Sequence, residues 1–150
     1  MYRVRTPGYS KRDQAMRWAL PDRVFFACGA CHILAHVFLQ RYGRATDQVL
    51  WLRPVPGHTG NHIVVARGSS VFDYHGHSDL ARFLAHSWRR ARHFWPGWDA
   101  ELVVLPRATL ISERLSRTFP GLWLREPGQF LHDPIERAER FLDRFPPPPD

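Results

Sequence analysis

The densest run of apolar positions covers residues 24–42 and contains the only two cysteines, Cys28 and Cys31. Apolar residues recur three, four and seven positions after Cys31, which is the spacing of one face of an α-helix. Gly43 then supplies a helix stop. The pattern predicts a buried central helix that begins near Cys31 and ends at Gly43. The short apolar segment before it, residues 24–27, is compatible with an extended conformation.

Four further segments have the β-branched or aromatic composition of strands, namely residues 48–53, 61–67, 71–74 and 101–105. Gly68-Ser69-Ser70 separates the second from the third and predicts a β-hairpin. The loop at residues 54–60 contains two prolines and two glycines, which cannot continue a ladder.

Helical patterns fill much of the remainder: residues 11–20, a long amphipathic helix capped by Ser78-Asp79, residues 108–117, and a last helix that starts at Asp133-Pro134. Residues 1–10 and 119–129 are expected to be irregular. A helix followed by mostly antiparallel strands, with more helices around them, predicts the α+β class. We expect one domain over residues 1–145 and a frayed proline-rich tail over residues 146–150.

Composition narrows the classes of protein that fit. At 150 residues with 44% hydrophobic residues, the chain is long enough for a real core. No apolar run reaches the ~18 to 20 residues of a membrane span, and the first ten residues have no signal-peptide core. We therefore expect a cytoplasmic protein with no membrane partner. The net charge of +7 is nearly all arginine, which favours acidic partners or nucleic acid.

Cys31 is the candidate nucleophile, because a thiol at a helix start has its thiolate stabilised by the helix dipole and unpaired backbone N–H groups. His62 begins a predicted strand, and Asp73 lies in the next one across the hairpin turn. Pairing about that turn makes His62 and Asp73 directly opposed or diagonal neighbours, within reach of a contact. Sequence thus predicts a Cys31–His62–Asp73 triad with no metal or cofactor.

This order resembles the papain-like and transglutaminase-like cysteine superfamily, in which a G-x-C motif opens a helix, a histidine begins a strand and an aspartate follows in the neighbouring strand. The matching pieces lie within residues 24–76. The resemblance implies that Cys31 is the nucleophile, His62 the general base and Asp73 its orienter. It also implies acyl transfer from a protein or peptide amide by a peptidase, deamidase or transglutaminase. The upstream glutamine of papain-type enzymes is replaced by Val24-Phe25-Phe26, so backbone N–H groups are expected to stabilise the oxyanion.

Three further interpretations of the cysteines remain open. An extended segment, a C-x-x-C and a helix would resemble a thioredoxin-like redox protein. Cys28-Gly-Ala-Cys31-His32 matches the c-type haem attachment motif. A zinc site would use Cys28, Cys31 and a histidine as ligands. The histidines available for it are His32, His36, His58, His75 and His77.

A non-catalytic interpretation rests on the long helix after Asp79. Its arginines, interleaved with aromatic residues, have the composition of a nucleic-acid surface. These residues are Arg82, Arg89, Arg90 and Arg92, with Trp88, Phe94, Trp95 and Trp98. The same pattern is typical of an amphipathic helix with a solvated basic face.

Overall fold

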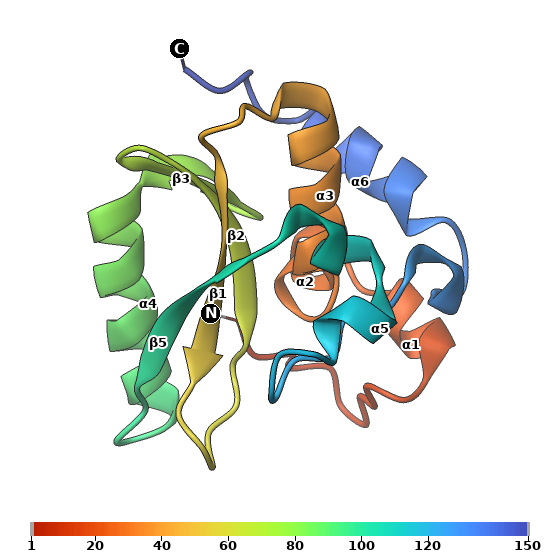
Figure 1. Ribbon diagram of the computed structural model, residues 1–150. Coiled ribbons are helices and arrows are strands. Elements are labelled where there is room, and N and C mark those ends of the chain that lie inside the picture. The colour runs from red at the N-terminus through yellow and green to blue at the C-terminus, as the bar shows by residue number, and fades with distance from the viewer. Residues whose placement is uncertain (1, 150) are drawn as a thin grey trace.

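The computed structural model describes residues 2–149 and has helices on both faces of one antiparallel sheet (Figure 1). The helices are α1 (Gln14–Trp18), α2 (Asp22–Ala27), α3 (Cys31–Tyr42), α4 (Leu80–Phe94), α5 (Glu113–Ser116) and α6 (Pro134–Leu142), with 3₁₀ turns η1 (Arg107–Ile111) and η2 (Pro127–Gln129). The strands are β1 (Gln48–Pro54), β2 (His62–Arg67), β3 (Ser70–Asp73), β4 (Gly76–Asp79) and β5 (Ala100–Leu105), in the spatial order β4-β3-β2-β1-β5. The α+β prediction is confirmed.

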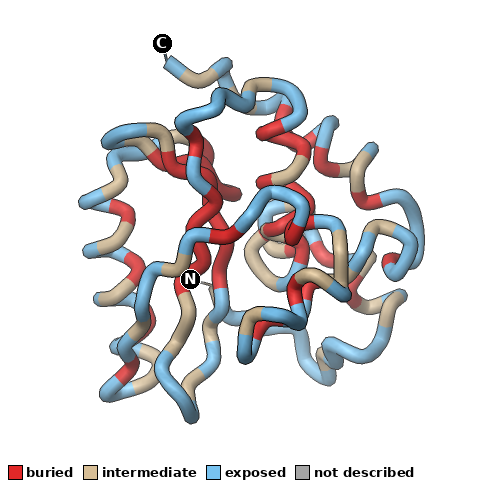
Figure 2. The backbone as a smooth tube through the Cα atoms, viewed as in Figure 1, coloured by how far each residue is buried: buried red, intermediate tan, exposed pale blue. Residues whose placement is uncertain are grey.

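Apolar clusters lie on both faces of the sheet. The buried residues gather along the strands and along the sides of α3 and α4 that face the sheet (Figure 2). Side chains that alternate along the strands, such as Trp51, Ile63 and Phe72, pack against α3 and its neighbours. The intervening residues, such as Val64 and Val71, pack under α4. Both faces are therefore covered, which explains why β1 and β2 are apolar at almost every position rather than at alternate ones.

The predicted central helix is confirmed as α3, which is buried along most of its length. It contacts α2 and α6 as well as β2 and β3, and this enclosure explains its apolar residues on most sides. Ala30 is its N-cap residue and has no polar side chain with which to cap the helix. The N–H groups of the first turn of α3, beginning at Cys31, thus lack a capping side chain.

The predicted hairpin forms from β2 and β3. Arg67 pairs with Ser70, so the turn has Gly68 and Ser69 as its central residues. Gly68 has a φ of 55°, which a type II′ hairpin turn requires at its first central position. If this register continues to the start of β2, His62 lies opposite His75 and diagonal to Asp73.

Several segments differ from the prediction. Residues 24–27 belong to the helix α2 and are not extended. The helix predicted over residues 11–20 is confined to Gln14–Trp18, and the one over residues 108–117 is split at Ser112 into η1 and α5. The sequence does not predict the strand β4, because Gly76-His-Ser-Asp79 has no strand-like alternation.

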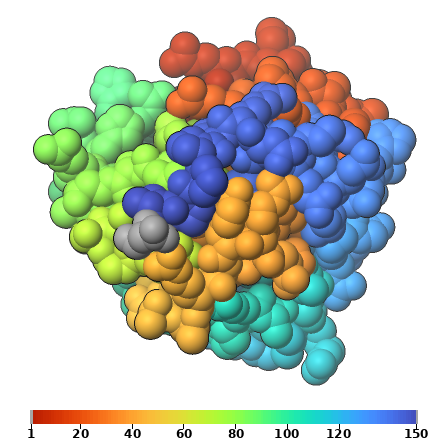
Figure 3. All heavy atoms as spheres, turned by 90° about the horizontal axis from the view of Figure 1, so that it is seen from above, coloured from red at the N-terminus to blue at the C-terminus, as the bar shows by residue number. Residues whose placement is uncertain are grey.

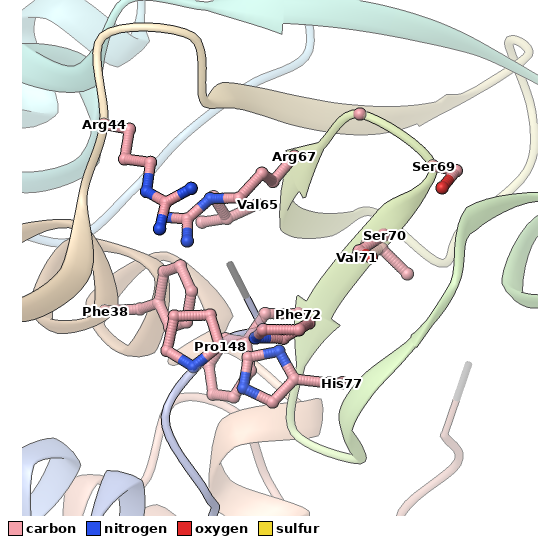
Figure 4. Close-up of a pocket in the computed structure, with 12 residues that line it drawn as sticks. Phe38, Arg44, Val65, Arg67, Ser69, Ser70, Val71, Phe72, His77 and Pro148 are labelled. Atoms are coloured by element: carbon pink, nitrogen blue, oxygen red, sulfur yellow. The ribbon is translucent and has the colours of Figure 1, made fainter.

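The C-terminal tail extends without a helix over residues 146–149, where Pro148 is half-buried and the other three residues are exposed. It lies beside α3 and the β3–β4 region when the molecule is seen from above (Figure 3). The Nε2 of His77 donates a hydrogen bond to the carbonyl of Pro146 at 3.1 Å. Pro148 borders a pocket of about 300 Å³ with Phe38 and His77, beneath the side chains of Arg44 and Arg67 (Figure 4). This pocket contains none of the predicted triad residues.

Candidate active site

The predicted triad residues come together at one end of the sheet. Cys31 is the first residue of α3, His62 the first of β2 and Asp73 the last of β3. The Nε2–H of His62 donates to Oδ2 of Asp73 at 3.0 Å, and both side chains are almost fully buried. This contact leaves Nδ1 as the His62 nitrogen that can face the Cys31 sulfur, with which the imidazole interacts.

Electrostatics at Cys31 favour the thiolate. Burial alone would raise the pKa of the thiol, but hydrogen bonding and charge from the His32 and His62 side chains outweigh it and lower the pKa to about 5. Burial likewise opposes the imidazolium of His62, whereas Asp73 and Cys31 raise its pKa to about 9. The pair therefore favours a thiolate and an imidazolium near neutral pH.

Asp73 is held ionised by two histidines. Burial would raise its pKa, but hydrogen bonds from His62 and His75 keep the pKa well below the ordinary value. The backbone N–H of His75 donates to Oδ1 at 2.8 Å, and the His75 ring approaches the same oxygen at 3.2 Å. Asp73 thus holds His62 with one oxygen while His75 orients the carboxylate from the other side.

Sequence reasoning did not place His32 in the triad's surroundings. His32 is 2% exposed, and its Nε2–H donates to the carbonyl of Arg125 at 2.9 Å. The other ring nitrogen, Nδ1, is left to face the Cys31 sulfur, which therefore interacts with both His32 and His62. The adjacency of His32 to Cys31 in the sequence is the one signal of this role, although the motif by itself suggests a metal or haem ligand.

Cys28 differs sharply from Cys31. Its thiol donates to the carbonyl of Tyr2 at 3.8 Å, and burial raises its pKa to about 11. Both cysteines are free thiols. Because α2 replaces the extended segment before Cys28, the strand, C-x-x-C and helix order of the redox interpretation is absent.

A zinc site and a nucleic-acid surface gain no support from the described residues. Within residues 2–149, no group of three His, Cys, Asp or Glu side chains is arranged to hold a metal ion. The arginine face of α4 is exposed, but Trp98 is fully buried and the indole of Trp88 donates to Asp99. Those two rings are therefore packed rather than presented for base stacking. None of the described helices is long and apolar enough to cross a membrane.

Cys31 and His62 open into a cleft of about 840 Å³. Its walls come from the N-terminal segment, from residues 27–32, from residues 59–63 and from residues 121–125. Asn61 lies beside His62 on the wall and accepts a hydrogen bond from the indole of Trp51 at 2.8 Å. Cys31 is partly exposed and borders this cleft, so a substrate can reach it.

Comparisons with known proteins identify no relative of this chain: no protein-family model, no curated protein and no solved structure matches it.

Proposed function

We propose that the protein is a thiol-dependent acyl-transfer enzyme in which Cys31 is the nucleophile, His62 the acid and base, and Asp73 the positioning group. The observation that carries the proposal is the buried chain of contacts from the Cys31 thiol through His62 to Asp73. A nucleophile, a base and an orienting carboxylate in that order are what thiol acyl transfer needs.

The chemistry follows from the two protonation states. The Cys31 thiolate attacks the acyl carbon, and a C–S bond forms as the electron pair of the carbonyl moves to oxygen. When the tetrahedral intermediate collapses, the amine leaves with a proton from the His62 imidazolium. The resulting thioester is then attacked by water or an amine, whose proton His62 takes, and the Cys31 thiolate is released.

Backbone N–H groups are the expected donors to the oxyanion. The first turn of α3 is free of a side-chain cap, and its N–H groups lie at the positive end of the helix dipole. This arrangement supports stabilisation of the negative oxygen next to Cys31. In this proposal, these N–H groups take the place of the glutamine that papain-type enzymes use.

An activated ester tests the proposal directly. With p-nitrophenyl acetate, attack by Cys31 forms the S-acetyl thioester and releases p-nitrophenolate. We expect a burst of p-nitrophenolate and one acetyl group on Cys31 by intact-mass and peptide mass spectrometry. The Cys31→Ala variant should show neither, whereas Cys28→Ser serves as the matched control and should keep both. Acetylation that is equal in wild type and Cys31→Ala contradicts the proposal.

A further inference from the structure

The cleft beside Cys31 is lined by cations. Five basic side chains border it, and no Asp or Glu among the described residues does so. The basic residues are Arg3, Lys11, Arg12, Arg17 and Arg125. Such a wall creates a positive potential that attracts anions and repels cations. The cleft therefore has a larger proportion of positive over negative side chains than the chain as a whole.

Arg17 is the most unusual of these residues, because it is only 7% exposed. Its guanidinium lies against the turn that leads into α3: a Cβ on Gly29 would come within 3.0 Å of the Arg17 Nη2. Gly29 has a φ of 120°, so both the backbone conformation and the space favour glycine there. The buried positive charge is thus fixed beside a residue only two positions from the nucleophile.

No carboxylate among the described residues forms an ion pair with Arg17. Its neighbours are the Phe130 ring, 5.7 Å from the guanidinium carbon, together with Tyr9 and a second cation, Arg125. Burial and then the Arg125 charge lower the pKa of Arg17. Burying a guanidinium without a counterion lowers the stability of the folded state, and a neighbouring cation lowers it further.

Two further little-exposed arginines of this chain do have carboxylate partners. Arg67 binds Asp47 at 2.7 Å, and Arg137 binds Asp22 at 2.8 Å. The Tyr9 hydroxyl beside Arg17 is buried and interacts with the guanidinium, but no hydrogen bond of good geometry satisfies it. Tyr9, Arg17 and Arg125 border the same cleft as Cys31. The three side chains also interact electrostatically with one another, so they lie close together on the cleft wall.

We propose that the acyl substrate of this site carries an oxyanion that binds to Arg17 and Arg125 and accepts a hydrogen bond from Tyr9. This inference rests on the proposed function of Cys31. A carboxylate or a phosphate has the negative charge and the paired oxygens that guanidinium groups bind. Binding would relieve the repulsion between the two arginines and satisfy the tyrosine hydroxyl at the same time.

Haloacetyl reagents of matched size test the inference. In each reaction the thiolate forms an S–C bond and the halide leaves with the electron pair. We would compare iodoacetate with iodoacetamide, and N-bromoacetyl-glycine with N-bromoacetyl-glycinamide, by measuring Cys31 alkylation in the full chain. The Cys31 rate with each reagent is divided by the rate of the same reagent with glutathione, which corrects for the intrinsic reactivity of the reagent. The anionic reagents should react faster by about tenfold or more, as one charge-assisted hydrogen bond implies.

Variants separate a specific site from net charge. Arg17→Met and Arg125→Ala should each abolish the preference for the anionic reagents. Arg82→Ala removes the same charge from the exposed start of α4, outside the cleft, and should retain the preference. An equal loss in Arg82→Ala, or no preference in the wild type, overturns the inference. A phosphonate analogue, N-bromoacetyl-aminomethylphosphonate, distinguishes phosphate from carboxylate by its rate relative to the carboxylate reagent.

Failure of the two proposals can be told apart. Slow alkylation of Cys31 by both neutral and anionic reagents contradicts the proposed nucleophile, whereas fast but charge-indifferent alkylation contradicts only the oxyanion site. Inorganic phosphate gives an independent readout, because binding to the folded state raises the Tm at constant ionic strength. That rise should be seen in wild type and Arg82→Ala and be absent in Arg17→Met. A wild type with no rise overturns phosphate as the oxyanion, and no rise together with no preference for the carboxylate reagents overturns the site.

Discussion

The imidazole of His62 and the carboxylate of Asp73 lie 3.0 Å apart although they belong to different strands and are separated by 11 positions in the chain. The turn at Gly68 and Ser69 brings them together, because its register, when continued to the start of β2, makes them diagonal neighbours. The contact therefore depends on turn length, and one residue more or less would place the two side chains on opposite faces of the sheet.

Cys31 should be alkylated faster than Cys28 near neutral pH. Their pKa values of about 5 and about 11 make Cys31 a thiolate at pH 7, whereas only about one Cys28 in 10⁴ is ionised. The less basic thiolate is intrinsically less nucleophilic, so the net advantage is about twentyfold. Iodoacetamide labelling followed by peptide mass spectrometry measures it across pH 5 to 9. Equal, slow labelling of both cysteines would contradict the assignment of Cys31 as the nucleophile.

Replacing His62 or Asp73 should alter the pH profile of this labelling. His62→Ala removes a stabilising partner of the thiolate, so the Cys31 pKa rises and labelling at pH 6 falls by about tenfold or more. Asp73→Asn should have a smaller effect there, because Asp73 acts through the imidazole. The control is His58→Ala, at a histidine outside both the triad and the cleft wall, which should leave the profile unchanged.

Acylation should depend on pH with two limbs. The rate rises as Cys31 ionises through about pH 5 and falls as His62 loses its proton through about pH 9. Asp73→Asn removes a group that raises the pKa of His62, so the upper limb should move to lower pH by about one unit or more. Initial rates of p-nitroaniline release from p-nitroacetanilide measure both limbs, because this amine leaves with a proton from His62. An upper limb that stays in place in Asp73→Asn contradicts the assigned role of Asp73.

The two cysteines should not be equivalent in function. Under a redox mechanism, Cys28→Ser and Cys31→Ser would both abolish disulfide exchange, which insulin reduction measures. Burial raises the pKa of Cys28, and the Cys28 thiol donates a hydrogen bond to the Tyr2 carbonyl. We therefore expect the Cys28→Ser variant to retain acylation. Insulin reduction by the wild type that both variants lose would favour the redox mechanism instead.

A structural ion pair far from the site should control stability rather than chemistry. The Asp47 side chain is fully buried and accepts two hydrogen bonds from Arg67, which also donates to the carbonyl of Tyr42. Asp47→Asn leaves the Arg67 charge without its partner, and we expect a loss of about 3 kcal/mol in urea unfolding. The exposed pair Glu136–Arg140 is the control, since Glu136→Gln should change little.

The same pair predicts a pH dependence of stability. The hydrogen bond with Arg67 is the main cause that lowers the pKa of Asp47 in the folded state. A carboxyl group with a lowered folded pKa stabilises the protein above its unfolded pKa, near ~3.9, and this contribution is lost as the pH falls. The gap in unfolding free energy between wild type and Asp47→Asn should therefore narrow below about pH 4. A gap that is constant from pH 7 to pH 3 contradicts the assignment.

Local signals explain which parts of the fold could be predicted from the sequence. The periodicity after Cys31 and the stop at Gly43 are contained within the helix itself, and the hairpin is specified by its own turn. Because the register follows from the turn, the neighbourhood of His62 and Asp73 could be predicted before any tertiary contact was known.

Elements that depend on tertiary contacts were less accessible. Residues 24–27 form a short apolar run, which fits a strand as well as a buried helix, and in the structure they complete α2, with Asp22 in its first turn. The strand β4 is held by pairing with β3 rather than by its own composition. Arg17 and Arg125 are more than 100 positions apart, and no local pattern could indicate that they share a cleft.

The wall of the cleft draws on segments from both halves of the chain, from the first few residues to Arg125. Closing loops of this length lowers the conformational entropy of the chain, and only the packing of the native state offsets that loss. We therefore expect such contacts to form late in folding. The central helix and the hairpin, by contrast, need only neighbouring residues. During refolding, the fast alkylation of Cys31 should consequently appear only with the final cooperative phase. The alkylation rate of this thiol would then report when the native state is complete.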